Sequence, residues 1–104
     1  MTTFVLLSKV SPAAASQVTD LAEMDQVLER ELAELLPQVK RIASYALLGA
    51  YDFMHIFEAP DATTAAKVAL LANRFGVSST QTLTAIPFSE FRELARGLGN
   101  HRFP

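Results

Sequence analysis

The sequence predicts an α+β fold with one four-stranded antiparallel sheet, helices on one face of it, and an added C-terminal helix. Short apolar runs alternate with longer segments in which apolar residues recur every three or four positions, and this order predicts β-α-β-β-α-β. Right-handed crossovers place the first and third strands in the centre of the sheet. The composition agrees, because the predicted outer strands carry the Lys, Arg, Ser and Thr that discourage stray pairing.

Length and composition narrow the class of protein. A chain of 104 residues, half of them hydrophobic, is long enough for one core and too short for two. Its net charge of −2 gives no basic face for nucleic acid or an anionic membrane. The absence of cysteine fits a reducing compartment, and the four apolar residues near the N-terminus are too few for a signal peptide or a membrane span. We therefore expect a cytoplasmic protein with no nucleic-acid or membrane partner.

The first predicted strand and helix follow directly from the pattern. The run 4–7 is a short strand that is apolar on both faces, with a turn at Ser11–Pro12. The helix begins either at Ser11–Pro12 or at a capping box made by Asp20 and Glu23, and it ends before Pro37. Its apolar stripe consists of Leu21, Met24, Leu28, Leu32 and Leu35.

The middle of the chain predicts a hairpin and a second helix. Residues 39–48 form a strand with mixed faces, residues 49–52 reverse the chain, and residues 53–57 form the third strand. Asp61 is placed to cap an alanine-rich helix that runs to Phe75, where Gly76 supplies a left-handed stop. This order completes the second half of a ferredoxin-like sheet.

The last strand and helix complete the fold. In residues 77–86, Ser, Thr and Gln alternate with apolar residues, which suits a strand with one wet face. Pro87 ends this strand, and Ser89 is expected to cap a short helix. Its apolar stripe consists of Phe91, Leu94, Ala95 and Leu98. We expect residues 1–87 to form the ferredoxin-like domain and residues 88–104, the C-terminal helix and tail, to belong to the same domain.

Both faces of the predicted sheet are apolar. In the first strand, Phe4 and Leu6 point to one side while Val5 and Leu7 point to the other. Helices cover only one face, and leaving several such side chains in water forfeits roughly 1.5–3 kcal/mol each. We therefore expect the chain to bind itself, as a homodimer through sheet faces or as a higher homo-oligomer. The alternative is that the C-terminal helix folds back over the bare face.

The central hairpin resembles a known family. The segment 47–61, with its Gly-Ala-Tyr-Asp stretch at 49–52, is similar to the signature of the GYD-domain family. The opening strand and the segment 79–85 are similar in placement, so the resemblance covers most of residues 3–86. It implies a ferredoxin-like subunit of the dimeric α+β barrel type, and it supplies no reaction. The chain departs from the family pattern at His55, where we would expect an aliphatic residue, and in the Ala/Ser-rich segment 13–16.

The candidate site residues lie around the same hairpin. His55 changes charge near neutral pH, alternates with Phe53 and Phe57, and has Tyr51 on the same side. If this is the face where sheets meet, these side chains and Tyr45 line an apolar pocket with a polar tip, the usual form of a ligand site. The structural alternative is a histidine packed in an aromatic layer and hydrogen-bonded across the interface.

Asp52 also has two interpretations. In a catalytic site it is a base or a cation ligand, with Tyr51 as a donor. In a structural role it bonds nearby backbone amides in the turn, with Gly49 at positive φ. We predict no metal site and no cofactor, because the chain has only two histidines, His55 and His101, and no cysteine.

Three functions fit the sequence. The first is an oligomeric α+β module that binds a small apolar ligand or acts as an accessory protein. The second is a small cofactor-independent enzyme, of monooxygenase or isomerase type, with His55, Tyr51 and Tyr45 around a pocket between two sheets. The third is a structural assembly unit. The pattern does not choose between an enzyme and a binding module.

Overall fold

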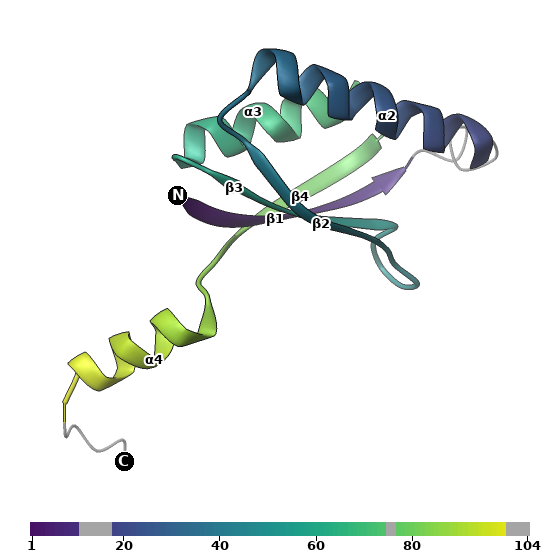
Figure 1. The fold of residues 1–104 in the computed structure, drawn as a ribbon. Helices are drawn as coiled ribbons and strands as arrows, with labels where there is room; N and C mark the ends of the chain where they lie inside the picture. Colours follow the sequence, from purple (N-terminus) through teal and green to yellow (C-terminus); the bar gives the residue numbers. More distant parts are fainter. Residues whose placement is uncertain (11–17, 75–76, 100–104) are drawn as a thin grey trace.

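The computed structural model describes residues 1–10, 18–74 and 77–99. They form the strands β1 (Thr2–Val10), β2 (Lys40–Ala46), β3 (Phe53–Ala59) and β4 (Val77–Ala85), and the helices α2 (Val18–Leu35), α3 (Ala62–Ala72) and α4 (Phe88–Gly97). The strand order is β2-β3-β1-β4 and every pairing is antiparallel. The predicted fold class is confirmed, with the first and third strands in the centre and α2 and α3 together on one face (Figure 1).

The core lies between that face and the two helices. Phe4 and Leu6 of β1 and Phe57 of β3 are almost fully buried, and the rings of Phe4 and Phe57 stack with their centroids 5.7 Å apart. Leu28 and Leu32 of the predicted α2 stripe pack against them, together with small residues of α3. The last predicted member of the stripe is wrong, because Leu35 is 60% exposed and Leu36 is buried instead. The buried helix-side partners are Leu28, Leu32, Leu36, Ala65, Val68, Leu71 and Ala72. The alternation of β1 thus produces one face that the chain covers by itself.

The ends of α2 and α3 test the predicted caps. Asp61 is the N-cap of α3 as predicted, and its carboxylate accepts from the backbone N–H of Thr64 at 2.8 Å and from the hydroxyl of Thr64 at 2.7 Å. These hydrogen bonds lower the pKa of Asp61, because they favour its charged form. Asp20 lies inside α2, so the prediction that this helix begins at a capping box made by Asp20 and Glu23 is wrong. The earlier start at Ser11–Pro12 and the stop at Gly76 lie outside the described residues.

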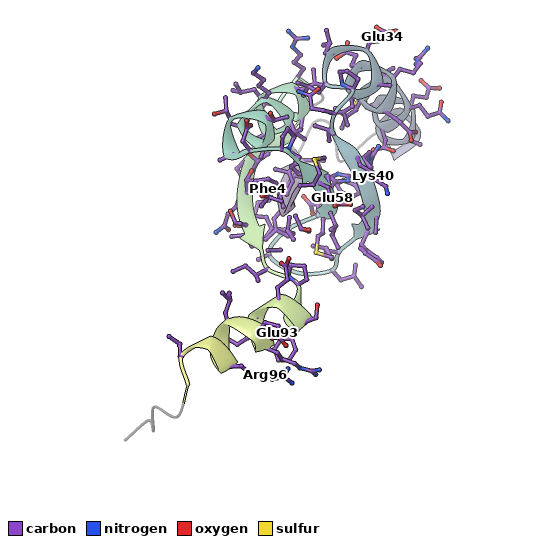
Figure 2. The ribbon with its side chains drawn as sticks, turned by 60° about the vertical axis from the view of Figure 1, so that its left-hand side comes forward. Phe4, Glu34, Lys40, Glu58, Glu93 and Arg96 are labelled. Atoms are coloured by element: carbon purple, nitrogen blue, oxygen red, sulfur yellow. The ribbon has the colours of Figure 1, made fainter. Side chains whose placement is uncertain are left out.

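The C-terminal helix α4 stands away from the rest of the chain. Figures 1 and 2 show it beyond the sheet, on the side opposite α2 and α3 and clear of the body. It begins at Phe88 with Pro87 at the N-cap position, so Ser89 lies inside the helix and the predicted cap is wrong. Since none of the ten described residues of α4 is buried, this helix does not cover the bare face of its own sheet.

Among the described residues, no helix combines the length and the apolar composition that crossing a membrane requires.

Candidate functional site

The strand pairing settles which side chains share the uncovered face. Val5 pairs with Ile56 and Leu83, and Leu7 pairs with Met54, so these residues point away from α2 and α3. We call this surface the helix-free face. Its apolar members are Val5, Leu7, Ala43, Tyr45, Met54, Ile56, Leu83 and Ala85. At its rim, 41% of Leu83 and 53% of Tyr45 are exposed.

His55 lies on the opposite face, towards α2. It pairs with Leu6, which is buried in the core, and with Ser44 on the edge strand β2. Its Nδ1 lies 2.8 Å from the hydroxyl of Ser44 and 3.3 Å from a guanidinium nitrogen of Arg41. Arg41 also donates to a carboxylate oxygen of Asp25 on α2 at 3.0 Å. The four side chains therefore join β2, β3 and α2.

The surroundings of His55 fix its protonation state. A guanidinium can only donate hydrogen bonds, so Nδ1 is an acceptor and the neutral ring carries its proton on Nε2. Burial lowers the pKa of His55 and the positive charge of Arg41 lowers it further, while Asp25 acts in the opposite direction. The histidine is thus held neutral at pH 7, and its lone pair is already engaged within the chain.

Tyr51 and Asp52 hold the β2–β3 hairpin against the other two strands. A carboxylate oxygen of Asp52 accepts from the backbone N–H of Val10 at 2.9 Å, and the backbone N–H of Asp52 donates to the carbonyl of Ser8 at 2.8 Å. The hydroxyl of Tyr51 donates to the side-chain oxygen of Gln81 on β4 at 2.6 Å. The Lys9 ammonium lies 5.7 Å from the centre of the Tyr51 ring. In the turn, Gly49 has the predicted positive φ, at 150°.

The structure brings some of the predicted site residues together and separates others. Phe53 stacks on His55 with ring centroids 6.5 Å apart, and Phe57 lies deeper in the same layer. Tyr45 pairs with Met54 and therefore lies on the helix-free face, the other side of the sheet from His55. The prediction that Tyr51 shares a side with His55 is also wrong, because its hydroxyl donates to Gln81, which pairs with Leu7 of the helix-free face. A pocket formed where two helix-free faces meet can include Tyr45, but it cannot include His55.

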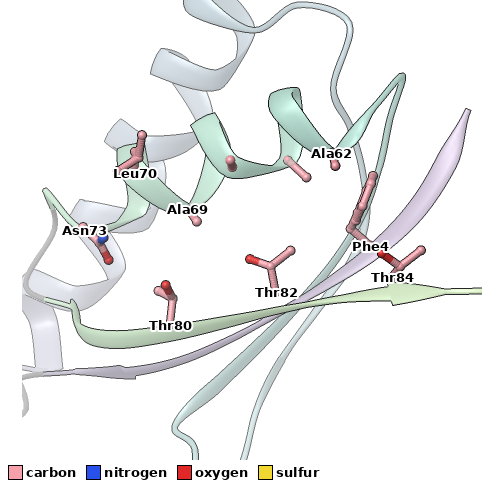
Figure 3. Close-up of a pocket in the computed structure, with 10 residues that line it drawn as sticks. Phe4, Ala62, Ala69, Leu70, Asn73, Thr80, Thr82 and Thr84 are labelled. Carbon is pink, nitrogen blue, oxygen red and sulfur yellow. The ribbon is translucent and has the colours of Figure 1, made fainter.

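An open groove lies between α3 and the edge strand β4. It has a volume of about 510 Å³, and Phe4 lies at one end of it, near Ala62 and Thr84 (Figure 3). Its walls are Thr80, Thr82 and Thr84 from β4 and Ala62, Ala66, Ala69, Leu70 and Asn73 from α3. The side chains are small and uncharged, which fits an apolar ligand with one or two polar atoms. The sequence did not predict this groove, because the threonines of the last strand were expected to lie on a face of the sheet that is exposed to solvent.

Within the described ranges, no three of the His, Asp and Glu side chains come close enough together to hold a metal ion.

Residues 4–95, which include most of β1 and the whole of β2, β3 and β4, match the family model of the GYD domain. The chain belongs to the GYD-domain family. A curated relative from Thermus thermophilus, named "Glutamine synthetase and cystathionine beta-lyase binding protein", is 39% identical over 95 residues. The alignment covers 86% of this chain and 94% of that relative. The match spans nearly the full length of both proteins.

Two solved structures show the same fold at low sequence identity. MtbAldR matches with a TM-score of 0.65 and 15% identity, over 83% of this chain and 53% of that one. An AsnC family transcriptional regulator from Agrobacterium tumefaciens matches with a TM-score of 0.59 and 14% identity, over 82% and 50%. This GYD-domain chain therefore spans about half the length of these two proteins. At such identities the likeness shows the fold alone.

Proposed function

We propose that this GYD-domain protein is a non-catalytic accessory module that acts as a homodimer and binds a metabolic enzyme. The observation that carries the proposal is the relative that is named for binding two enzymes, glutamine synthetase and cystathionine beta-lyase. An identity of 39% over nearly all of both chains supports a shared mode of action. We place this activity in the cytoplasm, because a chain without cysteine suits a reducing compartment.

The helix-free face supports self-association. Its central residues Val5, Leu7 and Ile56 are flanked by further apolar side chains, and no helix of the described chain covers them. Burying apolar surface yields roughly 25 cal/mol per Å², so contact between two such faces is strongly favoured. Two-fold symmetric pairing of one surface with itself is the commonest route to such contact. A dimer would leave the outer faces of α2 and α3 free for an enzyme partner.

The contacts of the predicted catalytic residues support binding rather than catalysis. The carboxylate of Asp52 accepts a backbone N–H, Nδ1 of His55 accepts within the Arg41 cluster, and the hydroxyl of Tyr51 donates to Gln81. Each group thus holds two segments of the chain together. The enzyme hypothesis needs His55 and Tyr45 around one pocket, whereas these side chains lie on opposite faces of the sheet.

A second candidate function is binding of a small apolar ligand. The groove of about 510 Å³ between α3 and β4 is large enough for one, and its three threonine hydroxyls can orient a polar atom. Such a ligand would lie on the helix side of the sheet, away from the surface that we propose for dimer formation. The two functions are therefore compatible in one molecule.

Interferometry with purified components tests the enzyme-binding proposal. The full chain is immobilised and exposed to glutamine synthetase, cystathionine beta-lyase and an unrelated cytoplasmic enzyme, all from the organism that encodes the chain. We expect saturable binding to at least one of the first two and none to the third. Absence of saturation with both enzymes up to about 100 μM, equivalent to less than about 5.5 kcal/mol of binding free energy, overturns the proposal.

A further inference from the structure

Helix α4 carries an apolar stripe that the described residues of its own chain leave exposed. Phe88, Phe91, Leu94 and Leu98 lie along one side of the helix, and between 51% and 66% of each side chain is exposed. The opposite side carries Glu93 and Arg96, which pair at 2.6 Å. A lone helix of ten residues is marginal in water, because its nucleation cost exceeds what so few backbone hydrogen bonds return. An amphipathic helix of this length therefore needs a surface to pack on.

The course of the chain puts α4 on the side where a second copy would lie. Only Ile86 and Pro87 separate the end of β4 from α4, and Pro87 is extended, with φ −52° and ψ 138°. The helix consequently continues away from the sheet edge, past the helix-free side and opposite α2 and α3 (Figure 1). A second sheet seated on the helix-free face would occupy the space beside α4.

We propose that α4 is an exchanged arm, which packs its apolar stripe onto the body of the second copy in the homodimer. The inference rests on the homodimer proposed above and goes beyond it, because it assigns the C-terminal helix to the interface. By two-fold symmetry each copy gives one arm and receives one arm. Each arm then closes one end of the contact between the two sheets, and the dimer is incomplete without it.

The surface area that a stable dimer must bury supports a second copy of this chain as the partner of α4. Four strands about 4.8 Å apart and about 25 Å long give the sheet face a footprint of roughly 480 Å². A ten-residue helix about 15 Å long and 10 Å wide adds roughly 150 Å², and each copy takes part in two such contacts. The two arm contacts thus enlarge the footprint of the interface by more than half. This extra surface favours a stable dimer, since specific interfaces bury about 800 Å² of accessible surface on each partner.

The stripe itself suits a second copy of this chain. Because its side chains are uncharged, it matches another apolar surface better than it matches a charged one. The helix-free face is such a surface, and its member Leu83 on β4 is 41% exposed. The arm of a second copy would cover this rim of the face, so both exposed surfaces would be buried by the same contact.

The test is the dimer dissociation constant of full-length variants, measured by sedimentation equilibrium. Leu94→Glu places a carboxylate in the stripe, and Ser89→Glu places the same group on the polar side of the same helix. We expect Leu94→Glu to raise the dissociation constant by at least tenfold and Ser89→Glu to change it by less than threefold. If Leu94→Glu and the parent chain have equal dissociation constants, the proposal that α4 is an exchanged arm is overturned. A truncation that ends at Pro87 repeats the test without the helix and should also raise the constant at least tenfold.

Hydrogen exchange provides an independent readout in the unmodified chain. The amides of residues 92–97 should exchange slowly at concentrations where the chain is a dimer, and at the rate of an isolated peptide after dilution to monomer. Exchange at the peptide rate in the dimer overturns the proposal. Different results would contradict the two hypotheses. A parent chain that stays monomeric contradicts the homodimer. A dimer whose dissociation constant is unchanged by Leu94→Glu contradicts only the proposal that α4 is an exchanged arm.

Discussion

The two faces of the sheet differ in what covers them, although the same strands build both. On β1, Phe4 and Leu6 are 3% and 1% exposed beneath the helices, while their neighbours Val5 and Leu7 are half-buried on the helix-free face. The side chains are similar in size and polarity. The difference therefore arises from topology, because two crossover helices protect one side only. The same strands therefore leave an apolar face that none of the described helices covers.

The largest effect is expected on the covered face. Phe57→Ala removes a ring that is 1% exposed and stacks on Phe4, so we expect the free energy of unfolding to fall by about 3–5 kcal/mol. Urea titrations followed by circular dichroism measure this loss. The matched control is Ile56→Ala, one residue earlier on the other face of β3. Its cost should depend on protein concentration, because the proposed dimer would bury Ile56 further than the single chain does.

A matched pair on one edge strand sharpens the comparison between the faces. Leu83 and Thr82 are both exposed in the isolated chain, but Leu83 lies on the helix-free face and Thr82 faces the α3 groove. We expect Leu83→Glu to raise the dimer dissociation constant by at least about a hundredfold, because an unpaired carboxylate buried in an interface costs several kcal/mol. Thr82→Glu should leave that constant unchanged. Light scattering over a dilution series compares them, and equal effects would contradict a dimer through the helix-free face.

The fold could be predicted from sequence because its signals are local. The period of the stripe in α2, the Asp61 cap and the alternation in β1 each depend on residues that are close in the chain. The errors are local as well. Ser89 has the residue type of a cap, but the helix already begins at Phe88, and the carbonyl of Pro87 accepts the first helical hydrogen bond from the backbone N–H of Phe91. Asp20 and Glu23 have capping-box spacing, yet α2 already begins at Val18.

The site was harder to predict because it depends on which face meets the helices. Alternation correctly grouped Phe53, His55 and Phe57, but it cannot say which side of the sheet the group takes. The pairing of His55 with the buried Leu6 decides this, and that register joins residues 49 positions apart. The groove at β4 has the same origin. Threonines at every second position and an alanine-rich α3 were both visible, but only the sheet order brings them together.

The smallest expected effect is the pH dependence that His55 adds to the covered face. Its pKa in the folded chain lies below the usual value of 6.5, chiefly through burial and then through Arg41, with Asp25 of α2 opposing. The unfolded chain therefore binds the proton more tightly. The contribution of the neutral His55 ring to the free energy of unfolding is therefore fully present above pH 6.5. It is lost as the pH falls through the pKa of the folded chain, and the free energy of unfolding then changes by at most about 1.4 kcal/mol per pH unit.

Urea titrations between pH 5 and 8 measure this dependence against His55→Gln, which keeps a side-chain acceptor near Ser44 and does not titrate. Both proteins carry His101→Gln, so that His55 is the only histidine left to titrate. We expect the free energy of unfolding to rise with pH more steeply in the His55 protein below pH 6.5, and the two curves to run parallel above it. A shallower rise with His55 present would mean that its folded pKa is raised. That result would contradict a neutral ring whose Nδ1 accepts from Arg41.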